Sequence, residues 1–351
     1  MSGIRFIHTY EDIISVENLL AAWREFLRGK RKKDDVRKFQ YHLSDNILAL
    51  HRDLKDKTYR HGAYEAFKIN DPKPRDIHKA TVRDRLLHHA IYRHLYPFFD
   101  HTFIADSYSC RRGKGTHKAM DRFRSFAYQV SKNHTRTVWV LKCDIKKFFA
   151  SIDQATLFAI VARYIPDKDI SRLIGEIIGS FQTHTTMPIG RSVCMEKRKG
   201  LPLGNLTSQL LVNIYMNEFD QFVKHKLKAR HYVRYADDFV VMSTDRVWLE
   251  GLIPLIARFL DERLALSLHP NKVSIATLAS GVDFLGWVHF SDHRVLRTTT
   301  KRRMLRRTAD LEKDDPTVRS YLGMLSHGNG EKLRDMVTKT VFALREPSKL
   351  K

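Results

Sequence analysis

The chain has 351 residues, 43% apolar and 29% charged, which is typical of a soluble globular protein with a large core and two or three lobes. No apolar run approaches the ~20 residues of a membrane-spanning helix, so no membrane association is expected. The three isolated cysteines, Cys110, Cys143 and Cys194, predict no disulfide framework and no zinc site, and so a reducing compartment.

The chain is strongly basic. Its 62 Lys and Arg against 39 Asp and Glu give a formal net charge of +23, concentrated in residues 24–38 and 294–307. Such a surplus favours polyanionic partners, because neutralising phosphates releases counterions. The alternative is that the charge serves solubility alone. The N-terminus lacks the basic-then-apolar order of a secretion signal, so we expect a cytoplasmic protein.

Apolar spacing predicts helices in the first part of the chain, interrupted by a loop that carries two prolines. Gly29 marks one helix end, and another helix is expected to end near Pro97. In chain order we predict a helix over 16–29, a helix over 34–57, a loop over 69–76 and a helix over 80–99.

The centre of the chain mixes strands with helices, which indicates an α+β fold. We predict a buried strand over 136–145, a long helix over 205–228, a two-stranded hairpin over 231–243, a helix over 246–264 and a strand over 280–290. The segments before and after this centre read as mostly helical and basic.

Three acidic residues stand at the ends of these strands. Asp144 ends the strand over 136–145, and Asp237 and Asp238 occupy the tip of the predicted hairpin. Carboxylates that lie close together repel one another unless cations intervene, and their oxygens suit Mg²⁺. Two such ions activate a 3′-hydroxyl and stabilise leaving pyrophosphate. The alternative is that the Asp-Asp pair only forms a tight turn.

Several motifs occur in a fixed order over residues 64–290 and together resemble reverse transcriptases. The "YADD" tetrapeptide between apolar strands resembles the polymerase motif of that family. Around it lie, in order, "KPRDIHKATVRDRLLHHAIY", "SYSCRRGKGTHKAM", "LKCDIKKFFASID", "KGLPLGNLTSQLLVNIYMNEFD", "LSLHPNKV" and "DFLGW". The resemblance implies an α+β right-hand polymerase fold with helical fingers, an antiparallel-sheet palm and a small helical thumb. The implied domains are 1–125 (N-terminal extension and fingers), 126–290 (palm) and 291–351 (basic thumb).

The resemblance also implies a role for each motif residue. Asp144, Asp237 and Asp238, with the backbone carbonyl of Ile145, would hold two Mg²⁺ ions, for which Mn²⁺ is a possible substitute. Phe149 would crowd the sugar 2′ position and exclude ribonucleotides, unless it is a core residue like Phe148. The implied dNTP-binding residues are Arg75, Arg111, Lys114, Phe149, Leu203, Gly204 and Lys272, where Lys272 would protonate the pyrophosphate. The implied template–primer contacts are Ser208, Gln209, Arg302, Arg303 and Arg306.

For the fingers cations, the alternative is general attraction to the phosphate backbone. For the paired histidines at 88–89, we expect packing or nucleic-acid contacts rather than metal binding.

One difference from most reverse transcriptases narrows the resemblance to a subgroup of that family. Many reverse transcriptases have Gln-Gly where this chain has Leu203-Gly204, and Ser-Pro where it has Ser208-Gln209. The pattern "GNLTSQ" resembles the enzymes of diversity-generating retroelements, which are bacterial or phage-encoded and copy a template RNA with errors at adenines. The implied partners are template RNA, the RNA–DNA heteroduplex, dNTPs and a small basic accessory variability determinant protein. Leu203 cannot donate the hydrogen bond of Gln, which predicts weaker discrimination between nucleotides. Alternatively, Leu203 only packs under the following helix.

Three other functions remain open from the sequence. The first is a retron-type or abortive-infection reverse transcriptase of phage defence, although the retron hallmark Val-Thr-Gly is absent. The second is an RNA-binding protein with an inactive polymerase fold, which the intact aspartates oppose. The third is a two-metal nuclease, which shares the aspartates but does not predict Phe149 or the fingers cations.

Overall fold

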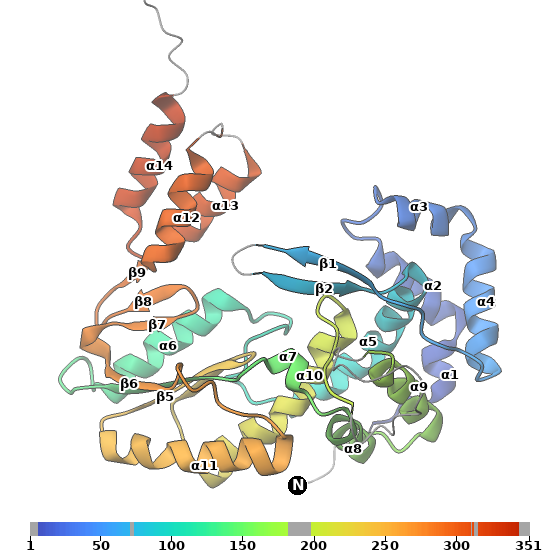
Figure 1. Cartoon of the computed structure of the whole chain (residues 1–351), viewed down its shortest axis with the longest axis horizontal. Helices are drawn as coiled ribbons and strands as arrows, with labels where there is room; N and C mark the ends of the chain where they lie inside the picture. The colour runs from blue at the N-terminus through green and yellow to red at the C-terminus, as the bar shows by residue number, and fades with distance from the viewer. Residues whose placement is uncertain (1–5, 71–73, 182–197, 310, 312–314, 344–351) are drawn as a thin grey trace, which may run out of the picture.

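The computed structural model describes residues 6–70, 74–181, 198–309, 311 and 315–343. Within them, the first part of the chain forms one arm, a sheet covered by helices forms the base, and the C-terminal helices form a second arm (Figure 1). Cys194 and residues 71–73 of the predicted loop lie outside the described residues.

The first arm is built from helices and one exposed β-ribbon. Its elements are α1 (Tyr10–Ile14), α2 (Val16–Phe26), α3 (Asp34–Tyr41), α4 (Leu43–Lys55), β1 (Glu65–Ile69), β2 (Arg75–Lys79) and α5 (Val82–Thr102). The antiparallel β1–β2 ribbon extends from this arm over the base toward the second arm (Figure 1).

Three predictions for this arm were wrong in detail. The single helix over 34–57 is broken at His42, whose φ of −111° and ψ of 40° are not helical. The predicted loop over 69–76 is shorter than expected, because β1 ends at Ile69 and β2 begins at Arg75. All five residues of β1 are exposed, so the burial of alternate residues that would mark a strand in the sequence is absent. The helix α5 continues through Pro97, because Leu95 and Phe99 on either side are buried and their packing outweighs the lost backbone hydrogen bond.

The base contains a four-stranded antiparallel sheet in the order β4-β5-β3-β6, formed by β4 (Tyr232–Tyr235), β5 (Asp238–Ser243), β3 (Trp139–Asp144) and β6 (Ser274–Thr277). Alternate residues face opposite sides. Leu141 and Phe239 pack with α10 (Leu206–Gln221) and α11 (Arg246–Leu264), whereas Val140 and Val240 pack with α6 (Thr116–Val130). Burial on both faces explains the continuous apolar sequence of β3.

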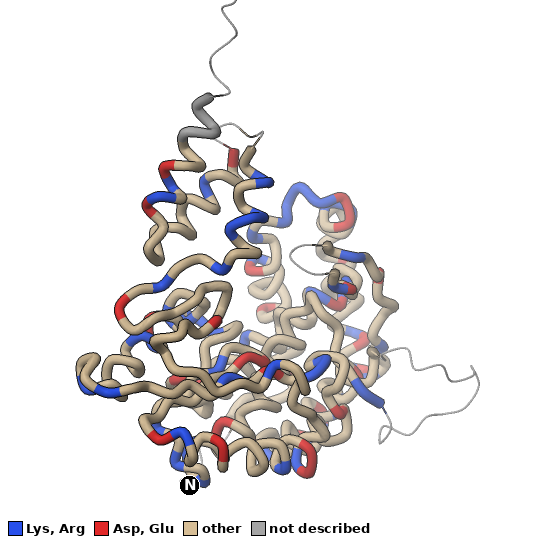
Figure 2. Tube along the Cα trace, turned by 60° about the vertical axis from the view of Figure 1, so that its left-hand side comes forward, with Lys and Arg blue, Asp and Glu red and all other residues tan. Residues whose placement is uncertain are grey.

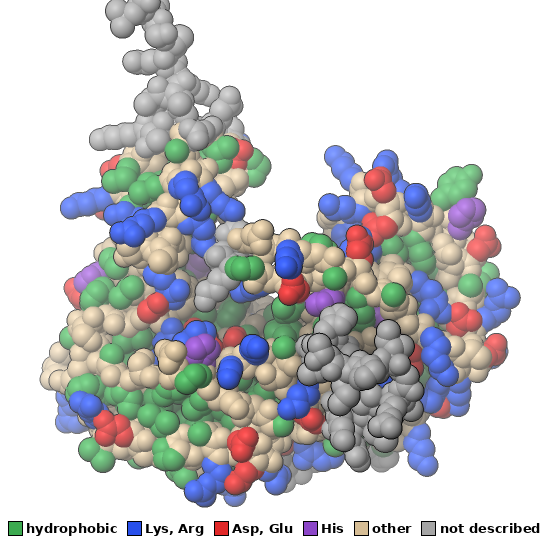
Figure 3. All heavy atoms as spheres, in the orientation of Figure 1, with side chains coloured by type: hydrophobic (Ala, Val, Ile, Leu, Met, Phe, Trp, Pro, Cys, Tyr) green, Lys and Arg blue, Asp and Glu red, His purple; other side chains and the backbone are tan. Residues whose placement is uncertain are grey.

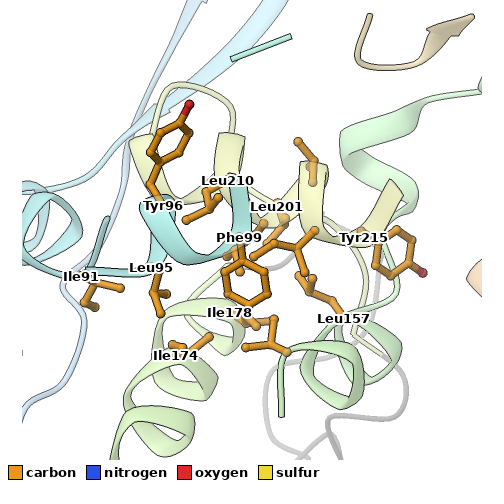
Figure 4. Packing of buried hydrophobic residues seen from close by; sticks show 14 of the residues in the cluster. Ile91, Leu95, Tyr96, Phe99, Leu157, Ile174, Ile178, Leu201, Leu210 and Tyr215 are labelled. Atoms are coloured by element: carbon orange, nitrogen blue, oxygen red, sulfur yellow. The ribbon is translucent and has the colours of Figure 1, made fainter. Parts of the chain in front are cut away.

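Three short helices complete the base: α7 (Phe148–Ser151), α8 (Gln154–Tyr164) and α9 (Lys168–Gly179). They join the base to the first arm through one apolar core. Figure 4 shows Phe99 of α5 among Leu157 of α8, Ile178 of α9 and Leu201. The strand-bearing base and the helical arm therefore share a core, which fixes where β2 lies relative to the sheet.

The predicted helix over 205–228 changes after Gln221 to a π-helical turn (Phe222–Lys226). A 3₁₀ turn (Leu278–Ser280) precedes the segment predicted as one strand over 280–290, which is a hairpin of β7 (Val282–Phe284) and β8 (Trp287–His289). The positive φ angles of Leu285 and Gly286 turn the chain between these two strands.

The second arm follows β9 (Arg294–Leu296), which pairs with β8. It consists of α12 (Thr298–Thr308), α13 (Pro316–Leu325) and α14 (Glu331–Ala343), packed around Met304, Val318 and Leu325 against Trp287. The predicted domain boundary between residues 125 and 126 falls inside α6.

Candidate active site

The three acidic residues predicted from the sequence meet at one end of the central sheet. Asp144, the last residue of β3, is paired directly with Asp238, the first residue of β5. Asp237 occupies the turn between β4 and β5, where Tyr235 pairs with Asp238. The turn has two residues, and its first, Ala236, has a left-handed φ of 56°. The strand order therefore brings together acids that are far apart in the sequence.

Burial and neighbouring charges raise the pKa of two of these carboxylates. Burial, and then the Asp144 carboxylate, raise the pKa of Asp237. Burial raises the pKa of Asp238 to about 7, with Lys142 opposing and both other aspartates adding to the rise. The Oδ1 atom of Asp238 is buried and has no hydrogen-bond partner among the described residues. Such an arrangement is costly in a folded protein unless a cation compensates it.

Two lysines supply positive charge at the site. Lys272 Nζ donates to Asp144 Oδ1 at 2.9 Å, and Lys142 Nζ lies 3.7 Å from Asp238 Oδ2 while donating to the Asp283 carbonyl. Within the described ranges, no group of three or more His, Cys, Asp or Glu side chains converges tightly enough to enclose a metal ion alone. The unpartnered Asp238 oxygen and the hard carboxylate ligands nevertheless fit Mg²⁺, which needs only one or two carboxylates besides substrate phosphates.

The predicted fingers cations differ in their surroundings. Arg75 begins β2 and is exposed, and its charge makes the smallest of the contributions to the pKa of Asp237, opposing the rise that burial causes. Lys114 Nζ donates to the Ala105 carbonyl at 2.7 Å. The side chain of Arg111 is 6% exposed, and its guanidinium donates to the Asp100 carboxylate and to the carbonyls of Ile104 and Ser107. A phosphate contact by Arg111 would require these internal hydrogen bonds to break.

The two phenylalanines of α7 differ in burial. Phe148 is in the core, whereas Phe149 is only partly buried and packs against that core from its edge. Its carbonyl accepts from the Leu201 backbone N–H at 2.9 Å, which links α7 to the loop before α10. One member of the pair is therefore a core residue, as the sequence analysis allowed.

The loop that carries Leu203 and Gly204 is attached to β2. The Leu203 carbonyl accepts from His78 N–H at 3.0 Å, and Asn205 Nδ2 donates to the His78 carbonyl at 3.0 Å. Gly204 has a φ of 107°, and a Cβ there would lie 2.8 Å from Ile77 Cγ2. The sequence reasoning missed Asn205 as the residue that joins this loop to the ribbon.

The predicted template–primer residues lie on two helices. On α10, Ser208 is buried and Gln209 is partly exposed; on α12, Arg302 and Arg306 are exposed and Arg303 is partly exposed. Figure 2 shows a concentration of Lys and Arg in the second arm. Figure 3 shows the surface hollowed beneath the β1–β2 ribbon, between the two arms.

A sheet carrying clustered acids between a helical arm with a ribbon and a second helical arm defines a right-hand polymerase fold. The chain belongs to the reverse transcriptase family: residues 68–289 match the family described as reverse transcriptase (RNA-dependent DNA polymerase). The predicted fold class is confirmed, and the matched range coincides closely with the motif series over 64–290.

Two curated relatives are similar to this chain over much of its length. Protein YkfC of Escherichia coli is 26% identical over 262 residues, covering 65% of this chain and 65% of YkfC. The group II intron-encoded protein LtrA of Lactococcus lactis is 24% identical over 332 residues, covering 74% of this chain and 51% of LtrA. The chain thus spans about two thirds or half of the length of these relatives.

A solved structure of apo telomerase from Candida tropicalis, truncated from the C-terminal domain, has a TM-score of 0.48 at 11% identity. It covers 73% of this chain and 60% of that chain.

No helix in the described part of the chain is long and apolar enough to cross a membrane.

Proposed function

We propose that this chain is an RNA-directed DNA polymerase that extends a primer on an RNA template by two-metal nucleotidyl transfer. The observation that carries the proposal is the direct pairing of Asp144 with Asp238 beside Asp237, in a chain of the reverse transcriptase family. When bound there, Mg²⁺ ions would activate the primer 3′-hydroxyl and neutralise charge on the transferring phosphates.

The residues around the acids support this reaction. Asp144, Asp237 and Asp238, with the Ile145 carbonyl, would hold the metal ions. Arg75, exposed at the start of β2, would bind the incoming triphosphate. Phe149 would contact the deoxyribose, and its partial exposure allows this. Lys272, whose Nζ lies 2.9 Å from Asp144 Oδ1, would give a proton to the pyrophosphate.

We further propose that the enzyme serves a diversity-generating retroelement and copies adenines with errors. The support is chemical: Leu203 offers no side-chain hydrogen bond, and its loop is joined to β2 through the Leu203 carbonyl and the Asn205 side chain rather than through the Leu203 side chain. The partners would be a structured template RNA and a small basic accessory protein. The alternative, a retron-type or abortive-infection enzyme of phage defence, shares the active site and differs in its template and fidelity.

The test is primer extension on an RNA template with dNTPs and Mg²⁺. Wild-type protein should incorporate dNTPs, and Asp237→Ala should lower the rate by several orders of magnitude while template–primer affinity stays within about twofold. Asp245→Ala, at the exposed cap of α11, is the matched control and should extend normally. Cleavage of the template without incorporation would favour a nuclease and contradict the proposal.

A further inference from the structure

A buried ion pair lies directly beneath the metal-binding turn. Arg234 and Asp220 have side chains that are 1% and 0% exposed. Arg234 Nε and Nη2 donate to the two carboxylate oxygens of Asp220 at 2.7 and 2.6 Å. Tyr232 donates its hydroxyl to the same carboxylate at 2.7 Å. Arg234 belongs to β4 and Asp220 to α10, so the pair joins the sheet to the helix behind it.

Two further hydrogen bonds of Arg234 reach the turn before Asp237 and the loop at Ser107. Nη1 donates to the carbonyl of Ala236 at 3.0 Å, and Nη2 also donates to Ser107 Oγ at 3.1 Å. Ala236 immediately precedes Asp237 and has the left-handed φ of 56° that a non-glycine residue rarely adopts. Such a conformation persists only where its surroundings hold it, and the guanidinium is a group that does so.

The backbone of Arg234 holds a second functional segment. Its N–H donates to the Asp106 carbonyl and its carbonyl accepts from Tyr108 N–H, each at 3.0 Å. This segment leads into the loop that carries Lys114, whose ammonium bonds the Ala105 carbonyl. One residue thus connects the metal-binding turn with the proposed nucleotide-binding loop.

Stability alone does not account for this pair. Burying two charges costs several kcal/mol of desolvation, and apolar replacement of a buried ion pair is often neutral or stabilising. A planar guanidinium supplies what apolar residues lack: five donors in a fixed plane, able to bind a carboxylate, a carbonyl and a hydroxyl together.

We propose that Arg234 is a positioning residue for metal binding: held by Asp220, it fixes the Ala236 carbonyl and so the direction in which Asp237 presents its carboxylate. This inference rests on the proposed function, because it treats Asp237 as a metal ligand. Arg234, whose side chain is only 1% exposed, would touch neither substrate nor metal. Its effect should therefore be seen in metal affinity more than in nucleic-acid affinity.

The test compares Arg234→Lys with wild type. Lysine keeps a charge opposite Asp220 but cannot reach Asp220, Ala236 and Ser107 together, so the variant should fold while the turn loosens. Mn²⁺ binding to the template–primer complex, followed by the EPR signal of the free ion, should weaken about tenfold, the effect of losing one charge-assisted hydrogen bond. Template–primer affinity should change less than about twofold.

Two further variants complete the design. Arg163→Lys alters the exposed ion pair of Arg163 with Glu218, which also involves α10, and should leave Mn²⁺ affinity unchanged. Ala236→Gly keeps the ion pair but frees the turn, and should weaken Mn²⁺ binding about two- to threefold with little loss of stability. If Arg234→Lys does not fold, the Mn²⁺ affinity of Ala236→Gly tests the proposal in its place.

Wild-type Mn²⁺ affinity in a folded Arg234→Lys, or in Ala236→Gly where the lysine variant does not fold, would overturn the inference. A wild-type protein that binds Mn²⁺ but does not extend primers would instead overturn the proposed function and leave the role of Arg234 in metal binding intact.

Discussion

Replacing Asp238 by Asn is expected to stabilise the metal-free protein. The Asp238 carboxylate is 21% exposed, lies against two other aspartates, and has a pKa of about 7 instead of 3.8. The fold therefore keeps the proton of Asp238 to a higher pH than the unfolded chain does. Stability falls as the pH rises from 3.8 to about 7 and remains low above it. An Asn side chain does not ionise, so the variant should lack this loss.

The magnitude follows from the two pKa values. At about 1.4 kcal/mol for each pH unit between them, ionised Asp238 costs the folded protein on the order of 4 kcal/mol. The attraction of Lys142, 3.7 Å away, is already contained in that pKa, so Asn should gain on the order of 4 kcal/mol at high pH. A chain of 351 residues unfolds with an entropy of roughly 0.7 kcal/mol/K, which converts this gain to roughly 6 °C.

Thermal unfolding in EDTA, followed by circular dichroism at about pH 8 and about pH 4, measures this effect. Asp238→Asn should melt above wild type at the higher pH, and the difference should vanish at the lower. Saturating Mg²⁺ should raise the wild-type midpoint and narrow the gap, since ligands stabilise the state that binds them. Asp292→Asn, at an exposed carboxylate, is the control and should show no gain. An Asp238→Asn midpoint at or below wild type at about pH 8 would refute the electrostatic reasoning.

Two further changes test the loop between β2 and α10. Gly204→Ala should raise the KM for dNTPs several-fold, because its Cβ would lie 2.8 Å from Ile77 Cγ2 and its φ of 107° strains any other residue. Steady-state kinetics measure this, with Gly251→Ala in open space on α11 as the control, and an unchanged KM in Gly204→Ala would show that the loop does not set nucleotide binding. Leu203→Gln should lower misincorporation opposite template adenines, because the Gln amide restores a placed hydrogen bond. Sequencing cDNA made on an adenine-rich template checks this, and an identical error spectrum would remove Leu203 from the explanation of fidelity.

The strands were predictable from the sequence where their side chains are buried, because burial requires a recognisable pattern of apolar residues. The hairpin over 231–243 and the strand over 136–145 emerged because their apolar residues pack on both faces of one sheet. The β1–β2 ribbon did not, because the residues of β1 are all exposed. Pro97 suggested a helix end, but tertiary packing around it outweighed the local preference.

The acids of the site were predictable because their position at strand ends is itself a sequence pattern. Lys142 was within reach of the same reasoning, since it lies two residues before Asp144 and so on the same face of β3. The direction of the Arg111 side chain was not, because a motif gives the identity of a residue but not its partners. Its guanidinium is directed inward by Asp100 and by carbonyl groups that no pattern marks.

The ion pair of Arg234 with Asp220 could not be predicted either, because the sequence does not show which residues are partners. The two residues belong to different elements, and a charged side chain in an apolar strand reads as exposed until its partner is known. The sheet is covered by α6 on one face and by α10 and α11 on the other, so a charge on β4 must be paired internally or excluded. Coverage on both faces also confines the acids to the strand ends, where they meet solvent and substrate. The same packing that makes repulsion between Asp144, Asp237 and Asp238 costly therefore makes a fixed turn necessary, and Arg234 is the residue whose contacts fix it.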